Sequence, residues 1–266
     1  IRLAERHGEM VNPTVKAGNI SIQEISKTFS QLDGTLTQAL NEVVLDIQPG
    51  EFVTLIGPSG CGKSTLLRLI AGLIAPDKGR ITLDEVPIKA AGPDRGFVFQ
   101  QHTLFPWLTI QQNIAFGLKT QKKYAHQKDE VAAWLKLIGL EGFGNSYPHQ
   151  LSGGMCQRAA LARALITKPK ILLLDEPLGA LDAFTRMLMQ DELLKMWQEH
   201  QTTMVMVTHD VDEAIYLSDK VVIISARPGK IDKIVTINLP RPRARNAESF
   251  IDYRKKILDR LHFGGT

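Results

Sequence analysis

The chain has 266 residues, 44% hydrophobic and 23% charged, a composition that allows a sizeable core and excludes a disordered chain. No run of 18 apolar residues and no charged-then-apolar leader is visible, so we expect a cytosolic protein with neither a membrane span nor a secretory signal. Cys61 and Cys156 lie far apart, without a CxxC or Cys/His cluster, which argues against a disulfide framework and a zinc site.

The net charge of +4 is concentrated at the C-terminal end. Residues 239–266 hold seven Lys and Arg against three Asp and Glu, which accounts for the whole excess. A basic tail can bind nucleic acid or an anionic membrane surface, but a solvated charged face is the commoner explanation. We treat residues 239–266 as a basic C-terminal tail and expect no nucleic-acid partner.

The N-terminal half predicts strands followed by one helix. Residues 1–19 lack strand or helix periodicity and form an N-terminal extension that we leave out of the fold. Short β-like runs follow at residues 20–26, 43–47 and 51–57, separated by turn-forming residues. The run at 63–73 has helical periodicity, so a strand, a glycine-rich loop and a helix follow one another.

The middle section, about 101–168, is predicted to be an α-helical subdomain inserted in an α/β chain, with helices near 109–120, 128–140 and 153–167. Strands return at 170–176 and 202–209, with a helix near 182–200 between them, and then at 220–225 and 233–239. The runs "ILLL" and "MVMV" are apolar at every position, as parallel strands covered on both faces require.

The stretch "GPSGCGKST" at 57–65 matches the phosphate-loop pattern GxxxxGK[ST] in the strand-to-helix context that this pattern needs. Its glycines let backbone N–H groups wrap a phosphate, while Lys63 reaches the β and γ phosphates and the Ser64 hydroxyl ligates Mg²⁺. A plain glycine-rich turn is the alternative. The residues expected to bind the nucleotide here are Gly57, Ser59, Gly60, Cys61, Gly62, Lys63, Ser64 and Thr65.

Two further stretches suggest hydrolysis. The buried strand "ILLLDE" ends in Asp175, which can hold the hydration shell of Mg²⁺, and Glu176, which can polarise the attacking water. His209 ends a second apolar strand and could contact the γ-phosphate, because the carboxyl ends of strands in open α/β sheets converge on the ligand crevice. Seen alone, an acidic turn or a surface histidine would be ordinary.

These motifs, together with "LSGGMCQR" at 151–158, resemble the ATP-binding subunits of ABC transporters from Ile20 to about Asp259. The resemblance implies a P-loop NTPase fold, with a RecA-like core, an N-terminal antiparallel β subdomain and the inserted helical subdomain. The ATPase domain would span 20–238.

The same resemblance implies roles for further residues. Phe29 would stack on adenine, although a core phenylalanine is the alternative. Gln100 would meet Mg²⁺ and the water while contacting the transmembrane partner, and Gln101 beside it leaves the register open. Asp182 would link the two sites of a dimer, and His209 would be the switch histidine.

In that family two subunits face each other head to tail, and each ATP lies between one P-loop and the other chain's signature sequence. Ser152, Gly153 and Gly154 at a helix N-terminus would present free N–H groups to the γ-phosphate. Met155 and Gly179 stand where glutamine and serine are usual. With "GPDRGFVFQ" and "PGKIDKIVTINLPRPR", they resemble the importer subunits for nitrate, sulfonates, taurine and bicarbonate.

The expected cofactors are ATP and Mg²⁺. The expected partners are a second ATP-binding subunit, a membrane permease and, indirectly, a solute-binding protein, with the chain on the cytoplasmic face of the inner membrane. The stretch "FPWLT" at 105–109 is either core or part of the permease contact. A soluble ABC-type ATPase of DNA repair or translation, a P-loop kinase and an exporter subunit stay as alternatives. We also expect the Cys61 thiol to react, with ATP protecting it.

Overall fold

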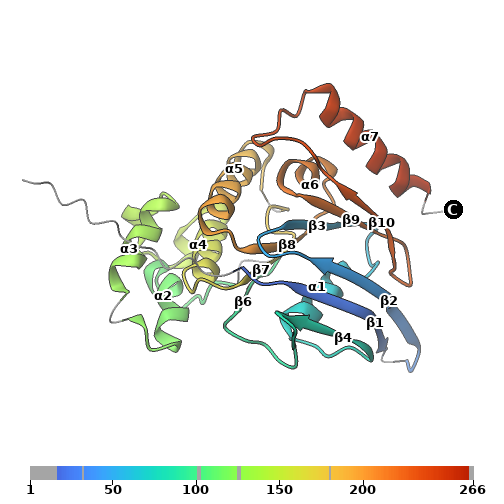
Figure 1. Cartoon of the computed structure of the whole chain (residues 1–266). Coiled ribbons are helices and arrows are strands. Elements are labelled where there is room, and N and C mark those ends of the chain that lie inside the picture. The colour runs from blue at the N-terminus through green and yellow to red at the C-terminus, as the bar shows by residue number, and fades with distance from the viewer. Residues whose placement is uncertain (1–16, 32, 101–102, 125–126, 180, 264–266) are drawn as a thin grey trace, which may run out of the picture.

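The computed structural model describes residues 17–31, 33–100, 103–124, 127–179 and 181–263, which form two sheets flanked by helices (Figure 1). The larger sheet has the strand order β10–β9–β3–β8–β7–β6. Its strands pair in parallel, except that β10 is antiparallel to β9. The strands are β3 (Phe52–Ile56), β6 (Arg95–Val98), β7 (Ile171–Asp175), β8 (Thr203–Val207), β9 (Lys220–Ile224) and β10 (Ile231–Thr236).

The smaller sheet is antiparallel, in the order β2–β1–β4–β5. Its strands are β1 (Ile20–Ser30), β2 (Leu36–Ile47), β4 (Lys78–Leu83) and β5 (Val86–Pro87). β1 thus ends beyond the predicted run 20–26 and β2 begins before the predicted run 43–47, because segments that mix polar and apolar residues continue both strands. Helix α1 (Lys63–Ala71) contacts β2 on one side and β6, β7 and β8 on the other, so it lies between the two sheets.

The central strands serve two cores, one on each face of the six-stranded sheet. Leu173 of β7 belongs to the cluster shared with α1 and the antiparallel sheet. Leu172 and Leu174 belong to the cluster shared with the helices of the opposite face. Side chains alternate along a strand, so a strand covered on both faces must be apolar at every position. The unbroken apolar runs in β7 and β8 are therefore explained, as predicted, by burial of both faces of these strands.

The predicted helices of the middle section are present. They are α2 (Ile110–Thr120), α3 (Lys128–Leu137) and α4 (Gly153–Leu165), with short 3₁₀ turns η2 (Glu141–Phe143) and η3 (Pro148–Gln150) between the last two. Thr109 and Gln112 form a reciprocal capping box that fixes the start of α2. Beyond this section lie α5 (Ala183–His200) and α6 (Val211–Leu217).

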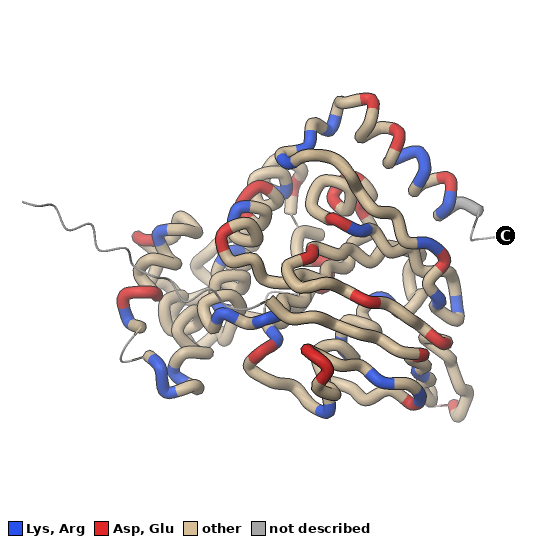
Figure 2. The backbone as a smooth tube through the Cα atoms, in the orientation of Figure 1, with Lys and Arg blue, Asp and Glu red and all other residues tan. Residues whose placement is uncertain are grey.

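The C-terminal segment packs onto the body of the protein. It ends in α7 (Glu248–Phe263), whose Phe250 and Ile257 are fully buried in the same core as Leu172. Lys and Arg alternate with Asp and Glu along this helix (Figure 2). Arg254 forms a two-pronged ion pair with Asp212 of α6. The segment read as a basic tail therefore contributes apolar core as well as charge.

None of the helices within the described ranges combines the length and hydrophobicity that crossing a bilayer requires. The N-terminal extension lies outside the described residues, except for residues 17–19. Gln101, the alternative register for Gln100, also lies outside them.

Candidate functional site

The phosphate loop joins β3 to α1, as predicted. Gly60 and Gly62 have φ angles of 74° and 97°, a region that L residues rarely adopt, so the loop needs glycine at both positions. Gly62 also caps the N-terminus of α1, where no side chain accepts the free N–H groups. Those N–H groups and the positive end of the helix dipole are available to an anion.

Lys63 lies inside this loop with only 7% of its surface exposed. Its Nζ donates to the backbone oxygens of Gly57, at 2.8 Å, and Pro58, at 2.9 Å. The ammonium group is thus held at the centre of the loop by neutral acceptors. A positive charge in that position can attract the phosphates of a nucleotide.

Ser64 and Asp175, predicted as the magnesium residues, lie together although 111 positions separate them. The Ser64 hydroxyl donates to Oδ1 of Asp175 at 2.8 Å. Burial raises the pKa of the Asp175 carboxyl, while the Ser64 hydrogen bond opposes that rise. A hydroxyl and a carboxylate are hard oxygen donors, and Mg²⁺ takes one or two such protein ligands beside water and phosphate oxygens. The donors fit the ion.

Glu176 follows at the end of β7 with a φ of 46°. Nε2 of Gln100 donates to its Oε2 at 3.0 Å, and Nδ1 of His209 lies 3.6 Å from the same oxygen. The three residues expected to act in hydrolysis therefore meet. A carboxylate with a free lone pair near the phosphate loop can accept a proton from water.

A pocket of about 250 Å³ opens beside the loop. Phe29 lines it and is 41% exposed, so it is not the core phenylalanine that the sequence left as the alternative. Ser59 is exposed and does not line this pocket. The lining residues are Phe29, Thr37, Ala39, Gly60, Gly62, Lys63, Ser64, Thr65 and Arg227.

Cys61 differs from the expectation of a reactive thiol. Its side chain is 1% exposed and packs in the core with α1 and the antiparallel sheet. The thiol points inward because the loop turns its backbone, and not this side chain, toward the pocket. A role for Cys61 in phosphate binding could come only from its backbone.

The signature residues lie apart from this pocket. Ser152 caps α4 by accepting from the N–H of Met155, at 3.3 Å, and with Gly153 it is exposed. Ser152 and Gly154 line another cavity, of about 490 Å³, which shares no lining residue with the pocket at the phosphate loop. Within one chain, the structure does not bring the two predicted phosphate sites together.

Asp182 caps α5 by accepting from the N–H of Thr185, at 2.9 Å, and is exposed. Hydrogen bonds from Thr185 lower the pKa of this carboxyl. Asp182 does not line the pocket at the phosphate loop.

Two features of the site were not predicted. Arg227, in the turn between β9 and β10, lines the pocket, and its Nε donates to the Gly60 oxygen at 3.1 Å. Glu213 accepts a short hydrogen bond from Thr208, the residue before His209, and so braces the loop that carries the histidine. The sequence offered a weak signal for the first, an arginine beside a Pro-Gly turn, and none for the second.

Comparisons with known proteins identify the family. The family model for ABC transporters matches residues 40–179. The aliphatic sulfonates import ATP-binding protein SsuB of Bacillus cereus is 52% identical over 92% of this chain and 97% of its own length. The protein of the same name from Bacillus subtilis is 49% identical over 91% of this chain and 93% of its own length.

Solved structures show the same architecture. A dimeric structure of MJ0796, a bacterial ABC transporter cassette, aligns with a TM-score of 0.73 and 34% identity, covering 83% of this chain and all of that one. A post-hydrolysis dimer of this cassette, bound to ADP and Pi, gives a TM-score of 0.72 at 33% identity. The fold is the predicted P-loop NTPase with its inserted helical subdomain, and the chain belongs to the ABC transporter family as one of its ATPase subunits.

Proposed function

We propose that this chain powers the import of aliphatic sulfonates through a membrane permease. The observation that carries the proposal is the extent of the likeness: relatives named for sulfonate import are about half identical along nearly their whole length. The motifs resemble importer subunits for nitrate, taurine and bicarbonate as well as for sulfonates. These three solutes are therefore the alternative substrates within this group.

The catalytic roles are proposed from the family resemblance, and the contacts within the site support them. Lys63 and the N–H groups of residues 57–65 bind the phosphates of ATP, and Phe29 covers the adenine. Ser64, Asp175 and Gln100 would hold Mg²⁺, and the ion would supply positive charge to neutralise what develops on the phosphates. Glu176 accepts a proton from the attacking water, and His209 contacts the γ-phosphate.

The second half of the site comes from another copy or a homologous chain. Ser152 and Gly154 line a cavity that shares no residue with the pocket at the phosphate loop, and with Gly153 they stand at the N-terminus of α4, where N–H groups are free for an anion. In a head-to-tail dimer they face the partner's γ-phosphate, with Asp182 between the two sites. Hydrolysis would break the bond to the γ-phosphate, and departure of the released phosphate would then remove the charge that joins the halves.

Mixing two inactive variants tests this arrangement. Lys63→Ala removes the charge that binds the phosphates. Ser152→Glu places a negative charge where the partner's γ-phosphate would lie, and a helix N-terminus such as this one tolerates an acidic residue. Each variant alone should be inactive. Mixed dimers have one intact site and one doubly damaged site, so an equal mixture should recover about a quarter of the wild-type sites. No recovery of phosphate release from mixtures proven to contain heterodimers would contradict the shared site.

The permease contact is proposed at "FPWLT". Trp107 is 70% exposed, and its ring lies against Phe105, which in turn packs on Phe116. An exposed aromatic cluster suits a protein partner, here on the cytoplasmic face of the inner membrane. Trp107→Glu should reduce the permease recovered with this chain. Leu36→Glu, at a residue 74% exposed in β2, is the matched control and should leave recovery unchanged.

The solute is tested in the assembled system, because it meets the permease and the solute-binding protein and not this chain. With both present in proteoliposomes, short alkanesulfonates should stimulate ATP hydrolysis more than nitrate, taurine or bicarbonate. Stimulation by one of those three instead would move this chain to another branch of the same group. In this proposal the ATPase domain spans residues 20–238 and the helical subdomain about 101–168.

A further inference from the structure

Arg227 stands at the mouth of the pocket that the phosphate loop lines. Its Nε is held by the backbone oxygen of Gly60 at 3.1 Å. One of its terminal nitrogens lies 2.6 Å from the point that a Cβ on Gly60 would occupy, so the guanidinium rests directly on the loop. The bond to Gly60 uses only Nε, and the two terminal nitrogens keep N–H groups for another acceptor.

The surroundings of Arg227 favour an anion. None of the described residues that line the pocket is acidic, and Lys63 supplies a second positive charge. Among the residues that the structure describes, Arg227 has no ion pair, whereas Arg241, Arg254 and Arg260 each pair with an aspartate. An arginine without a carboxylate, beside a phosphate-binding loop, has its charge available for the phosphates of a ligand.

The turn that carries Arg227 is fixed to both walls of the pocket. Gly229 exchanges backbone hydrogen bonds with β2, donating to Ala39 and accepting from Asn41, each at 3.0 Å. On its other side, a Cβ on Gly229 would lie 2.0 Å from the oxygen of Cys61, so only glycine fits between β2 and the loop. Arg227 is thus presented by an anchored turn, and little conformational freedom is lost when it binds.

We propose that Arg227 is a nucleotide-binding residue, whose terminal nitrogens donate to the triphosphate chain of ATP in the pocket that Phe29 also lines. The inference rests on the proposed nucleotide site. Arg227 adds to the phosphate loop a contact from a distant part of the sequence, since Gly60 and Arg227 are 167 positions apart.

The test measures dissociation constants of the purified full chain for MgATP and for inorganic tripolyphosphate, at low and moderate salt. Arg227→Ala should weaken both by about tenfold, because a charge-assisted hydrogen bond is lost from each. Arg227→Gln can still donate to Gly60 but has no charge, and it should lose the same affinity. The wild-type advantage should shrink as salt is added.

Lys230→Ala is the matched control, since it removes an exposed positive charge from the same turn without touching the pocket. It should bind both probes as the wild type does. Full affinity in Arg227→Gln would show that the side chain only holds the loop, and full affinity in both variants would remove Arg227 from the site; either result overturns the inference. Lys63→Ala separates this failure from that of the proposed function, because unchanged binding in that variant would mean that the pocket is not the nucleotide site.

Discussion

Glu176 and Gln100 are joined side chain to side chain, with Oε2 of the carboxylate accepting a 3.0 Å hydrogen bond from Nε2 of the amide. The bond connects Glu176, which directly follows β7, with Gln100, which follows the neighbouring strand β6, at the edge where the phosphate loop also lies. Holding the carboxylate from one side leaves its second oxygen for water. The strained backbone of Glu176, with φ at 46°, is consistent with a residue placed for chemistry.

Replacing Glu176 by Gln should separate binding from hydrolysis. The amide keeps the shape and can still accept from Gln100, but it cannot take a proton from water, so phosphate release should fall by a factor of about 10² to 10⁴. ATP affinity should stay, and the dimer should accumulate in size-exclusion chromatography with ATP. A monomer at saturating ATP would count against the two-chain site.

Asp175→Asn should change the magnesium requirement. The amide oxygen can still accept from Ser64, but the negative charge that holds the hydrated ion is gone. Half-maximal activity should then need about 10 to 100 times more Mg²⁺. A magnesium titration of ATP hydrolysis measures this, and an unchanged midpoint would remove Asp175 from the ion's surroundings.

Glu213→Gln should stabilise the chain at neutral pH. Burial raises the pKa of this carboxyl above its usual value, with Asp210 adding to the rise and Thr208, Gln190 and Arg186 opposing it. The folded state therefore binds this proton more tightly than the unfolded state, so the free energy of unfolding falls as the pH rises above the usual pKa of 4.5 and levels off above the raised folded-state pKa. The gain from Gln should be larger at pH 7 than at lower pH and should shrink as the pH falls toward 4.5, in denaturant titrations at several pH values. A gain in the free energy of unfolding that grew as the pH fell would contradict this prediction.

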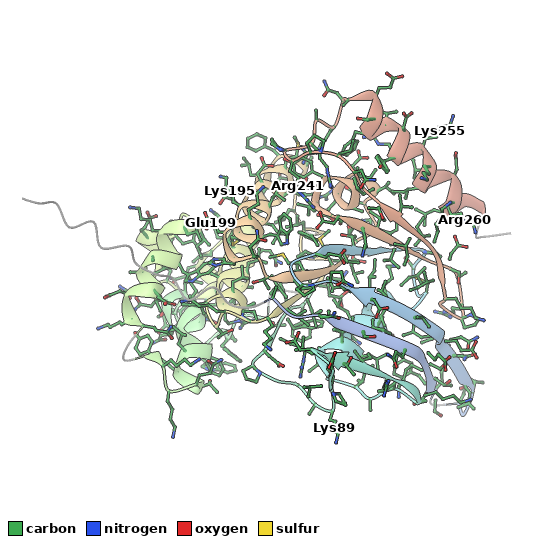
Figure 3. The ribbon with its side chains drawn as sticks, in the orientation of Figure 1. Lys89, Lys195, Glu199, Arg241, Lys255 and Arg260 are labelled. Carbon is green, nitrogen blue, oxygen red and sulfur yellow. The ribbon has the colours of Figure 1, made fainter. Side chains whose placement is uncertain are left out.

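Arg243→Leu should destabilise the fold. Arg243 is 4% exposed, and burial lowers its pKa to about 10. Its loss leaves buried carbonyl oxygens without donors, so the free energy of unfolding should fall by about 3 kcal/mol. Lys255, which points away from the body of the protein (Figure 3), gives the control variant Lys255→Ala, expected to change little. The oxygens that Arg243 serves belong to Ile215, Tyr216, Ser218, Ile237 and Leu239.

Both cysteines should resist thiol reagents in the folded protein. Cys61 and Cys156 are 1% and 5% exposed, and burial raises the pKa of the Cys156 thiol. Labelling should be at least about 100 times slower than in denaturant, because it waits for local unfolding. Mass spectrometry of timed samples measures the rates. If Cys61 were labelled rapidly and ATP blocked the labelling, the sequence-based expectation of a reactive Cys61 thiol would be correct after all.

The sequence predicted those parts of the site that local patterns encode. A glycine loop between a strand and a helix, and a strand that ends in Asp175 and Glu176, each carry their context within a few residues. The alternation of Leu172 and Leu173 between two cores was likewise implied by an unbroken apolar run. Such features depend on neighbours along the chain.

What the sequence could not predict depends on contacts between distant segments. Nothing near Arg227 shows that its turn reaches a loop 167 positions away. Arg243 looked like one charge of a solvated basic face, because composition does not show that it caps the carbonyl end of α6. The direction of the Cys61 side chain depends on the turn of the loop, which the motif leaves undefined.

The contacts of Lys63 with Gly57 and Pro58 have one more consequence. Because the ammonium group already holds the loop in a curved form, ligand binding does not have to order a flexible segment. Little conformational entropy of the loop is then lost on binding, so more of the contact energy appears as affinity. Association should accordingly be a single fast step, limited by encounter and not by a slow rearrangement of the loop.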